Sequence, residues 1–137
     1  MRSNYCTMTT DEKVTYWIEL SEYDLETAVV MLNTGRYLYV GFMCHQVIEK
    51  IFKALYSKLN EDTPPFSHKL VYLAKQGNFY DNLSEEQKVF IDQMEPLNIK
   101  TRYPDYKKEL AKQLNKEKCL EILEKTKTLQ LWMKEQL

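Results

Sequence analysis

The sequence is poor in the residues that tight turns require. Its 137 residues include only 3 Gly and 4 Pro, whereas a protein of many short strands needs Gly, Asn and Pro at its bends. A many-stranded β fold is therefore disfavoured. With 44% of its residues hydrophobic, the chain can bury a core, but it is too short to form two domains of ordinary size. We therefore predict one all-α domain.

Cysteine and net charge are scarce as well. Cys6, Cys44 and Cys119 are an odd number and far apart, so neither a disulfide framework nor a zinc site is indicated, and we expect a reducing compartment. A formal net charge of -1 gives no global positive field toward nucleic acid or anionic membranes. Any RNA or nucleotide contact must therefore come from a local patch.

The sequence also shows no segment with the hydropathy of a membrane span or a targeting signal. No apolar run approaches the ~18 residues of a membrane span, and no charged region followed by an apolar one opens the chain. We expect a cytoplasmic protein with no membrane contact.

The motifs of common phosphate-binding and metal enzymes are absent. The chain has no Gly-rich phosphate loop, no HExxH and no ExxH carboxylate pairs. Cys44 adjoins His45, but successive helix residues point about 100° apart and do not face each other. We therefore expect neither a metal nor a cofactor, and no activated Ser or Cys nucleophile.

What the sequence does contain is apolar residues at helical spacing. Thr9 and Glu12 have the spacing of a capping box, which predicts a helix from near residue 10 to a stop at Gly35. The apolar pattern resumes over residues 36–60. Because the break at Gly35 is short, we predict that these two helices form an antiparallel hairpin.

The second half of the chain predicts shorter helices separated by Pro and Gly. Ser84 and Gln87 repeat the capping-box spacing, and Pro96 should kink or end the helix that they open. Residues 97–106 are predicted to be irregular. The helices expected here cover 68–77, 84–94 and 115–137. We assign residues 1–9 to a flexible N-terminus and 10–137 to a single helical domain.

The helix predicted over 36–60 carries polar residues inside an apolar run. His45 and Glu49 are four apart and so share a face, while Gln46, Lys50 and Lys53 form a second stripe beside them. These side chains can line a polar pocket that binds a ligand. Alternatively, His45 and Glu49 form a hydrogen-bonded pair that fixes the helix register, and the two lysines are solvated.

Three further residues outside this helix are candidates for binding. Arg102 and Tyr103 precede Pro104, and an arginine there can grip a phosphate or RNA, or tie the segment to the bundle by pairing with Glu49. His68 lies at a predicted helix start. It either caps or packs against that helix, or it belongs to the ligand-binding site. The candidate ligand-binding residues are therefore His45, Gln46, Glu49, Lys50, Lys53, His68, Arg102 and Tyr103.

The chain is rich in tyrosine. Its 10 Tyr can stack on bases, but tyrosine is also common at the rim of bundle cores and at protein interfaces. Since no basic surface surrounds these residues in the sequence, we favour an interface.

Four motifs follow one another in a fixed order along the chain. They are Trp17-Ile18 with Asp24-Leu25-x-x-Ala28, Gly35-x-Tyr37, the run from His45 to Leu55, and His68-x-Leu70 followed by Arg102-Tyr103-Pro104-Asp105. In this order they resemble the HEPN domain family, specifically the prokaryotic branch often encoded beside a minimal nucleotidyltransferase. The resemblance covers about residues 14–135. It implies an up-and-down bundle of four main helices with a short additional helix, dimerising through helix faces.

Members of the family that this sequence resembles differ in function. Many family members are RNases, often toxins, in which an Arg is followed after four to six residues by a His and two copies build the site across a dimer. This sequence departs from that pattern, since eight residues separate Arg36 from His45 and no His follows Arg102. The usual acid/base partner for activation of a 2′-OH is therefore absent from its expected place.

Two hypotheses remain. In the first, the protein is a binding module that docks a minimal nucleotidyltransferase, as a toxin–antitoxin pair or a substrate-binding subunit, and contacts nucleotide or RNA through its polar residues. In the second, it is a divergent metal-independent ribonuclease that assembles His45, Glu49 and Arg102 across a homodimer. The missing Arg–His spacing favours the first, and hence binding over catalysis.

Overall fold

The computed structural model describes residues 5, 7–99 and 104–137, and within these ranges the chain forms helices and no strand. The all-α prediction is confirmed. The elements in chain order are α2 (Thr10–Asn33), α3 (Tyr37–Asn60), α4 (Leu70–Gln76), the 3₁₀ turn η1 (Tyr80–Asn82), α5 (Glu85–Met94), the 3₁₀ turn η2 (Glu95–Leu97), α6 (Pro104–Gln113) and α7 (Lys116–Glu135). None of the described helices is long and apolar enough to cross a membrane.

The predicted hairpin of α2 and α3 is present, and local hydrogen bonds fix both of its ends. Thr9 and Glu12 form the expected capping box at the start of α2. At its end, Gly35 adopts a left-handed φ of 74°, and the Arg36 N–H donates to the Met31 carbonyl at 2.8 Å. A left-handed glycine followed by this long backward bond is the usual way to stop a helix and reverse the chain.

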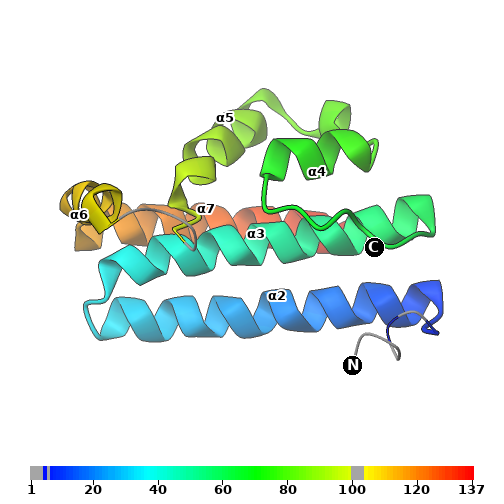
Figure 1. Cartoon of the computed structure of the whole chain (residues 1–137), viewed down its shortest axis with the longest axis horizontal. Coiled ribbons are helices and arrows are strands. Elements are labelled where there is room, and N and C mark those ends of the chain that lie inside the picture. The colour runs from blue at the N-terminus through cyan, green and yellow to red at the C-terminus, as the bar shows by residue number, and fades with distance from the viewer. Residues whose placement is uncertain (1–4, 6, 100–103) are drawn as a thin grey trace.

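Helix α3 is the most enclosed element. Figure 1 shows it between α2 on one side and α4 on the other, and α7 packs along it. Its buried side chains therefore point in nearly every direction, as Val47, Phe52 and Lys53 on three different faces illustrate. This enclosure is why polar residues of α3 also become buried.

Short helices cover the side of α3 that faces away from α2. Phe79, just before η1, packs edge-on against Phe52 of α3 with ring centroids 5.2 Å apart. Ser84 and Gln87 form the second predicted capping box, at the start of α5. Pro96 has the predicted effect, since α5 ends at Met94 and the tighter turn η2 follows.

Two expectations about boundaries are wrong. The irregular stretch predicted over residues 97–106 ends too late, because Pro104 is the first residue of α6 and not part of a loop. A proline lacks the N–H that the first helical position leaves unbonded anyway, and its fixed φ suits a helix start. In addition, α4 begins at Leu70 and not at His68. The last helix starts as predicted, with the Asn115 side chain accepting from the Lys118 N–H at 2.8 Å.

Candidate functional site

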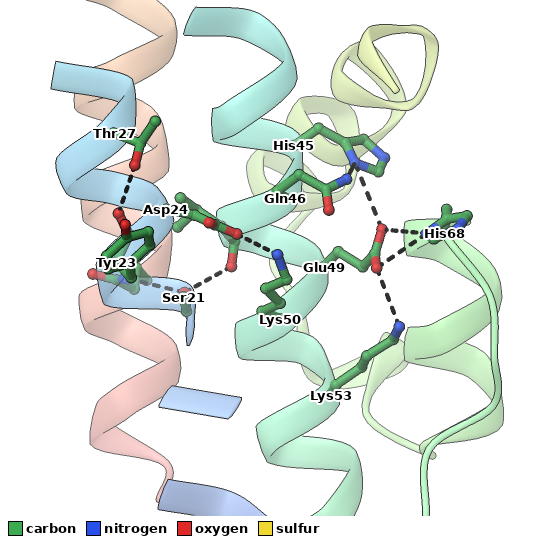
Figure 2. Close-up of polar contacts among 12 residues, drawn as sticks. Ser21, Tyr23, Asp24, Thr27, His45, Gln46, Glu49, Lys50, Lys53 and His68 are labelled. Carbon is green, nitrogen blue, oxygen red and sulfur yellow. Dashed lines mark hydrogen bonds and ion pairs between the residues drawn. The ribbon is translucent and has the colours of Figure 1, made fainter. Parts of the chain in front are cut away.

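Two of the polar residues predicted on α3, His45 and Lys53, lie at the carboxylate of a third, Glu49. Lys53 Nζ lies 3.1 Å from Glu49 Oε2, and His45 Nδ1 lies 3.9 Å from Glu49 Oε1. From the loop before α4, His68 Nδ1 reaches Glu49 Oε1 at 3.0 Å and Oε2 at 3.2 Å. Figure 2 shows the three side chains around this carboxylate. His45, Glu49 and Lys53 are spaced by four and so share one face of α3.

The Glu49 cluster, meaning His45, Glu49, Lys53 and His68, lies mostly inside the protein. His45 is 0% exposed, Glu49 2% and Lys53 5%. A buried carboxylate is tolerated only when cations and hydrogen bonds replace its lost hydration. Lys53 supplies a cation, His68 a ring nitrogen within hydrogen-bond distance, and the Lys53 ammonium also lies 5.2 Å from the centroid of the Trp17 ring. The carboxylate is thus held by its neighbours.

The members of the second predicted stripe, Gln46, Lys50 and Lys53, have different partners and different exposures. The expectation that both lysines are solvated is wrong for Lys53, because packing on both sides of α3 buries it. Lys50 forms an ion pair with Asp24 of α2 and is half-buried. Gln46 lies beside His45, with Nε2 3.4 Å from His45 Nδ1. Sequence reasoning missed the role of Asp24, although it belongs to the first motif of α2.

His68 anchors a loop. The first N–H of α4, that of Leu70, donates to Glu95 Oε1, so Glu95 and not His68 satisfies the start of that helix. His68 instead ties the loop before α4 to α3 through Glu49. Its side chain is 33% exposed, which makes it the member of the cluster that reaches the surface. No sequence pattern identified Glu95, because its partner lies 25 residues away.

A cleft of about 540 Å³ opens beside His68. Phe66 stands 91% exposed at this cleft, its ring centroid 6.0 Å from that of His68. Asn98 Oδ1 is buried and has no hydrogen-bond partner among the described residues. Burial raises the pKa of the Glu95 carboxyl, although the bond from Leu70 opposes this. The lining residues are Phe66, Ser67, His68, Lys69, Glu95, Pro96, Asn98 and Tyr106.

The cleft combines one exposed aromatic face with hydrogen-bond acceptors and an imidazole. This set suits a flat polar molecule whose ring stacks and whose edge donates hydrogen bonds. Arg102 and Tyr103, the two remaining candidates, lie outside the described residues. No group of three or more His, Cys, Asp or Glu in the described ranges is arranged to hold a metal ion.

Comparison with known proteins gives two matches. The family model of the HEPN domain matches residues 14–136. Among solved structures, the crystal structure of TT1696 from Thermus thermophilus is similar, with a TM-score of 0.76 and 21% sequence identity over 91% of this chain and 98% of that one. At this identity the likeness shows a shared fold. No curated protein matches the sequence.

Proposed function

The chain belongs to the HEPN domain family, and we propose that it is a binding module that docks a minimal nucleotidyltransferase. It serves either as one half of a toxin–antitoxin pair or as a substrate-binding subunit, in the cytoplasm. The observation that carries this proposal is the enclosure of the Glu49 cluster, in which the titratable groups of α3 face one another and not a substrate.

Enclosure argues against catalysis by the residues that the sequence singled out. A general base must come within about 2.6–3.2 Å of the atom that carries the proton it removes, directly or through one water. His45 and Glu49 lie in the core of the helical fold, so a strand of RNA cannot reach them there. Glu49 has a structural task, since it ties α3 to the loop before α4 through His68.

Nucleotide or RNA contact is the extension of this proposal, and the cleft beside His68 is where we place it. A base can stack on the exposed ring of Phe66, and the partly exposed imidazole of His68 lies on the same lining and can hydrogen-bond to its edge. Lys69 lies on the same lining and can meet a phosphate. The contact is local, in keeping with a chain whose net charge is -1.

One observation favours the second candidate function, a divergent metal-independent ribonuclease acting as a homodimer. His68 is partly exposed and its Nδ1 is held by the Glu49 carboxylate, which is how a carboxylate orients an imidazole that acts as a base. In this reading His68, and not His45, would take the proton from a 2′-OH. Glu49 would be a positioning residue.

Two experiments on the full-length chain separate these candidates. Tagged protein is captured from its native host and its companions are identified by mass spectrometry; recovery of a small nucleotidyltransferase is the expected result. Purified wild type, His45→Ala and His68→Gln are then incubated with RNA. The binding proposal expects no cleavage by any of them, and it is overturned if wild type cuts RNA and His68→Gln does not.

A further inference from the structure

An unusual row of side chains runs along the outside of α2. Tyr16, Leu20, Tyr23, Thr27 and Val30 follow one another at intervals of four, three, four and three residues, which is the seven-residue repeat of a coiled-coil seam. We call this row the outer stripe of α2. Its members Tyr16, Tyr23 and Val30 are 37%, 68% and 55% exposed, while Leu20 and Thr27 are half-buried.

The outer stripe is not part of the bundle core. The core face of α2 is carried by other residues, among them Val14, Ser21 and Ala28, which are buried. Figure 1 shows α2 as the outermost long helix, with α3 on one side and no described helix over most of the opposite side. Near the start of α2, the ring centroid of Tyr5 lies 5.4 Å from that of Tyr16. Single exposed apolar residues are ordinary on soluble proteins, but two tyrosines and a valine in helical register form a continuous surface. From Tyr16 to Val30 it runs about 21 Å.

The charges beside the stripe narrow the choice of occupant. Glu19, Glu22 and Glu26 are exposed along one edge. Within the described ranges Glu22 pairs with Lys134 at 3.4 Å, whereas Glu19 and Glu26 form no ion pair. On the opposite edge, the charge of Lys50 is neutralised by Asp24. Along this edge the stripe is therefore bordered by the uncompensated negative charges of Glu19 and Glu26.

These negative charges decide whether the outer stripe is covered by a second copy of the chain or by a different protein. Two outer stripes packed antiparallel about a two-fold axis would place Glu19 and Glu26 of one chain along the same residues of its copy. Like charges in such positions disfavour pairing, whereas lysine or arginine on the partner would favour it.

We propose that the outer stripe of α2 is a docking surface for an amphipathic helix of another protein, one with an apolar seven-residue repeat flanked by Lys or Arg. This deepens the proposed function, on which it rests for the identity of the partner, by naming the surface and the chemistry that the partner must present.

Two synthetic helical peptides of equal length test the surface directly. Both carry Leu at the seam positions; one has Lys and its twin has Glu at the flanking positions. Each is labelled and titrated with the full chain at about 0.15 M salt, where the Debye length is about 8 Å and only short-range charge contacts persist. We expect the Lys-flanked peptide to bind at least about tenfold more tightly than its twin.

Variants of the chain locate the binding. Tyr23→Ala and Val30→Ala should each weaken binding of the Lys-flanked peptide by about tenfold, and Glu19→Lys with Glu26→Lys should invert the preference between the peptides. The matched control is Glu109→Lys with Glu124→Lys, which makes the same charge change at side chains 67% and 71% exposed on α6 and α7. This control should retain the wild-type preference.

The outcomes separate the surface from the proposed function. Equal binding of both peptides, or undiminished binding by Tyr23→Ala and Val30→Ala, overturns the docking surface whatever the host capture finds. Light scattering that gives a dimer in wild type and a monomer in Tyr23→Glu also overturns it, because a second copy then covers the stripe. A host capture that yields no nucleotidyltransferase, with peptide discrimination intact, overturns the proposed function alone.

Discussion

His68 Nδ1 lies 3.0 Å from Glu49 Oε1, although the two residues are 19 positions apart and belong to a loop and a helix. This contact ties the loop of residues 61–69 to α3. It holds the His68 imidazole between the buried carboxylate of Glu49 and the edge of the cleft. The stability of the fold and the chemistry available at its surface therefore depend on the same carboxylate.

Removing the buried cation beside Glu49 should be costly. Lys53→Met leaves a carboxylate that is 2% exposed with less compensation, and breaking a buried pair in this way costs about 3–5 kcal/mol. Urea unfolding of the two proteins measures the change. The control is Lys112→Met, whose side chain is 75% exposed beside Glu109 and should cost about 0–1 kcal/mol. Equal small losses would show that Glu49 does not depend on Lys53.

The loop before α4 should loosen when its anchor is removed. In His68→Ala, no side chain ties residues 61–69 to Glu49, so backbone amides in this loop should exchange with deuterium faster than in wild type. Hydrogen exchange followed by mass spectrometry resolves the segment. Phe66→Ala, which removes a ring that is 91% exposed, serves as the control and should leave exchange unchanged. Unaltered exchange in His68→Ala would contradict the anchoring role.

Glu95 gives a pH dependence with a definite sign. Burial raises the pKa of its carboxyl above the ordinary 4.5, so the folded protein keeps this proton at pH values where the unfolded chain has lost it. Its contribution to stability is therefore present below pH 4.5 and decreases as the pH rises through the folded value. Glu95→Gln cannot ionise and still accepts the Leu70 N–H, so the stability of wild type relative to this variant should fall with rising pH. A difference that is flat or rises would refute this.

Two of the three thiols should be inert in the folded protein. Burial raises the pKa of Cys44 to about 12 and that of Cys119 to about 11, and the thiolate is the form that reacts. Treatment with iodoacetamide at pH 8 should leave both unmodified, and denaturant should expose them; peptide mapping identifies each site. Rapid alkylation of Cys44 under native conditions would show that α3 is less enclosed than the structure indicates.

Features written into a few consecutive residues could be predicted from the sequence. The capping boxes at Thr9 and Ser84 involve partners three positions away, and the stop at Gly35 depends on its own backbone angle. Each is fixed by local hydrogen bonds, and each was predicted at the right place. Pro104 was not, because a proline can end one helix or begin the next, and the residues around it do not decide between the two.

The candidate site shows the same division. The spacing of His45 and Glu49 predicted a shared face of α3. It could not predict that Lys53 is buried, because burial there depends on which elements cover α3 from the other side. Nor could it predict that Glu95 receives the first N–H of α4, a contact that exists only once α5 has folded back against α4.

The central claim, that this HEPN domain acts by binding another protein, is tested most directly by the mass of the assembly captured from its host. Native mass spectrometry of that assembly weighs the intact complex. The expected mass is a whole multiple of the 16.4 kDa chain plus the mass of a small nucleotidyltransferase. A mass equal to a multiple of 16.4 kDa alone would contradict it and would leave the homodimeric ribonuclease as the better account.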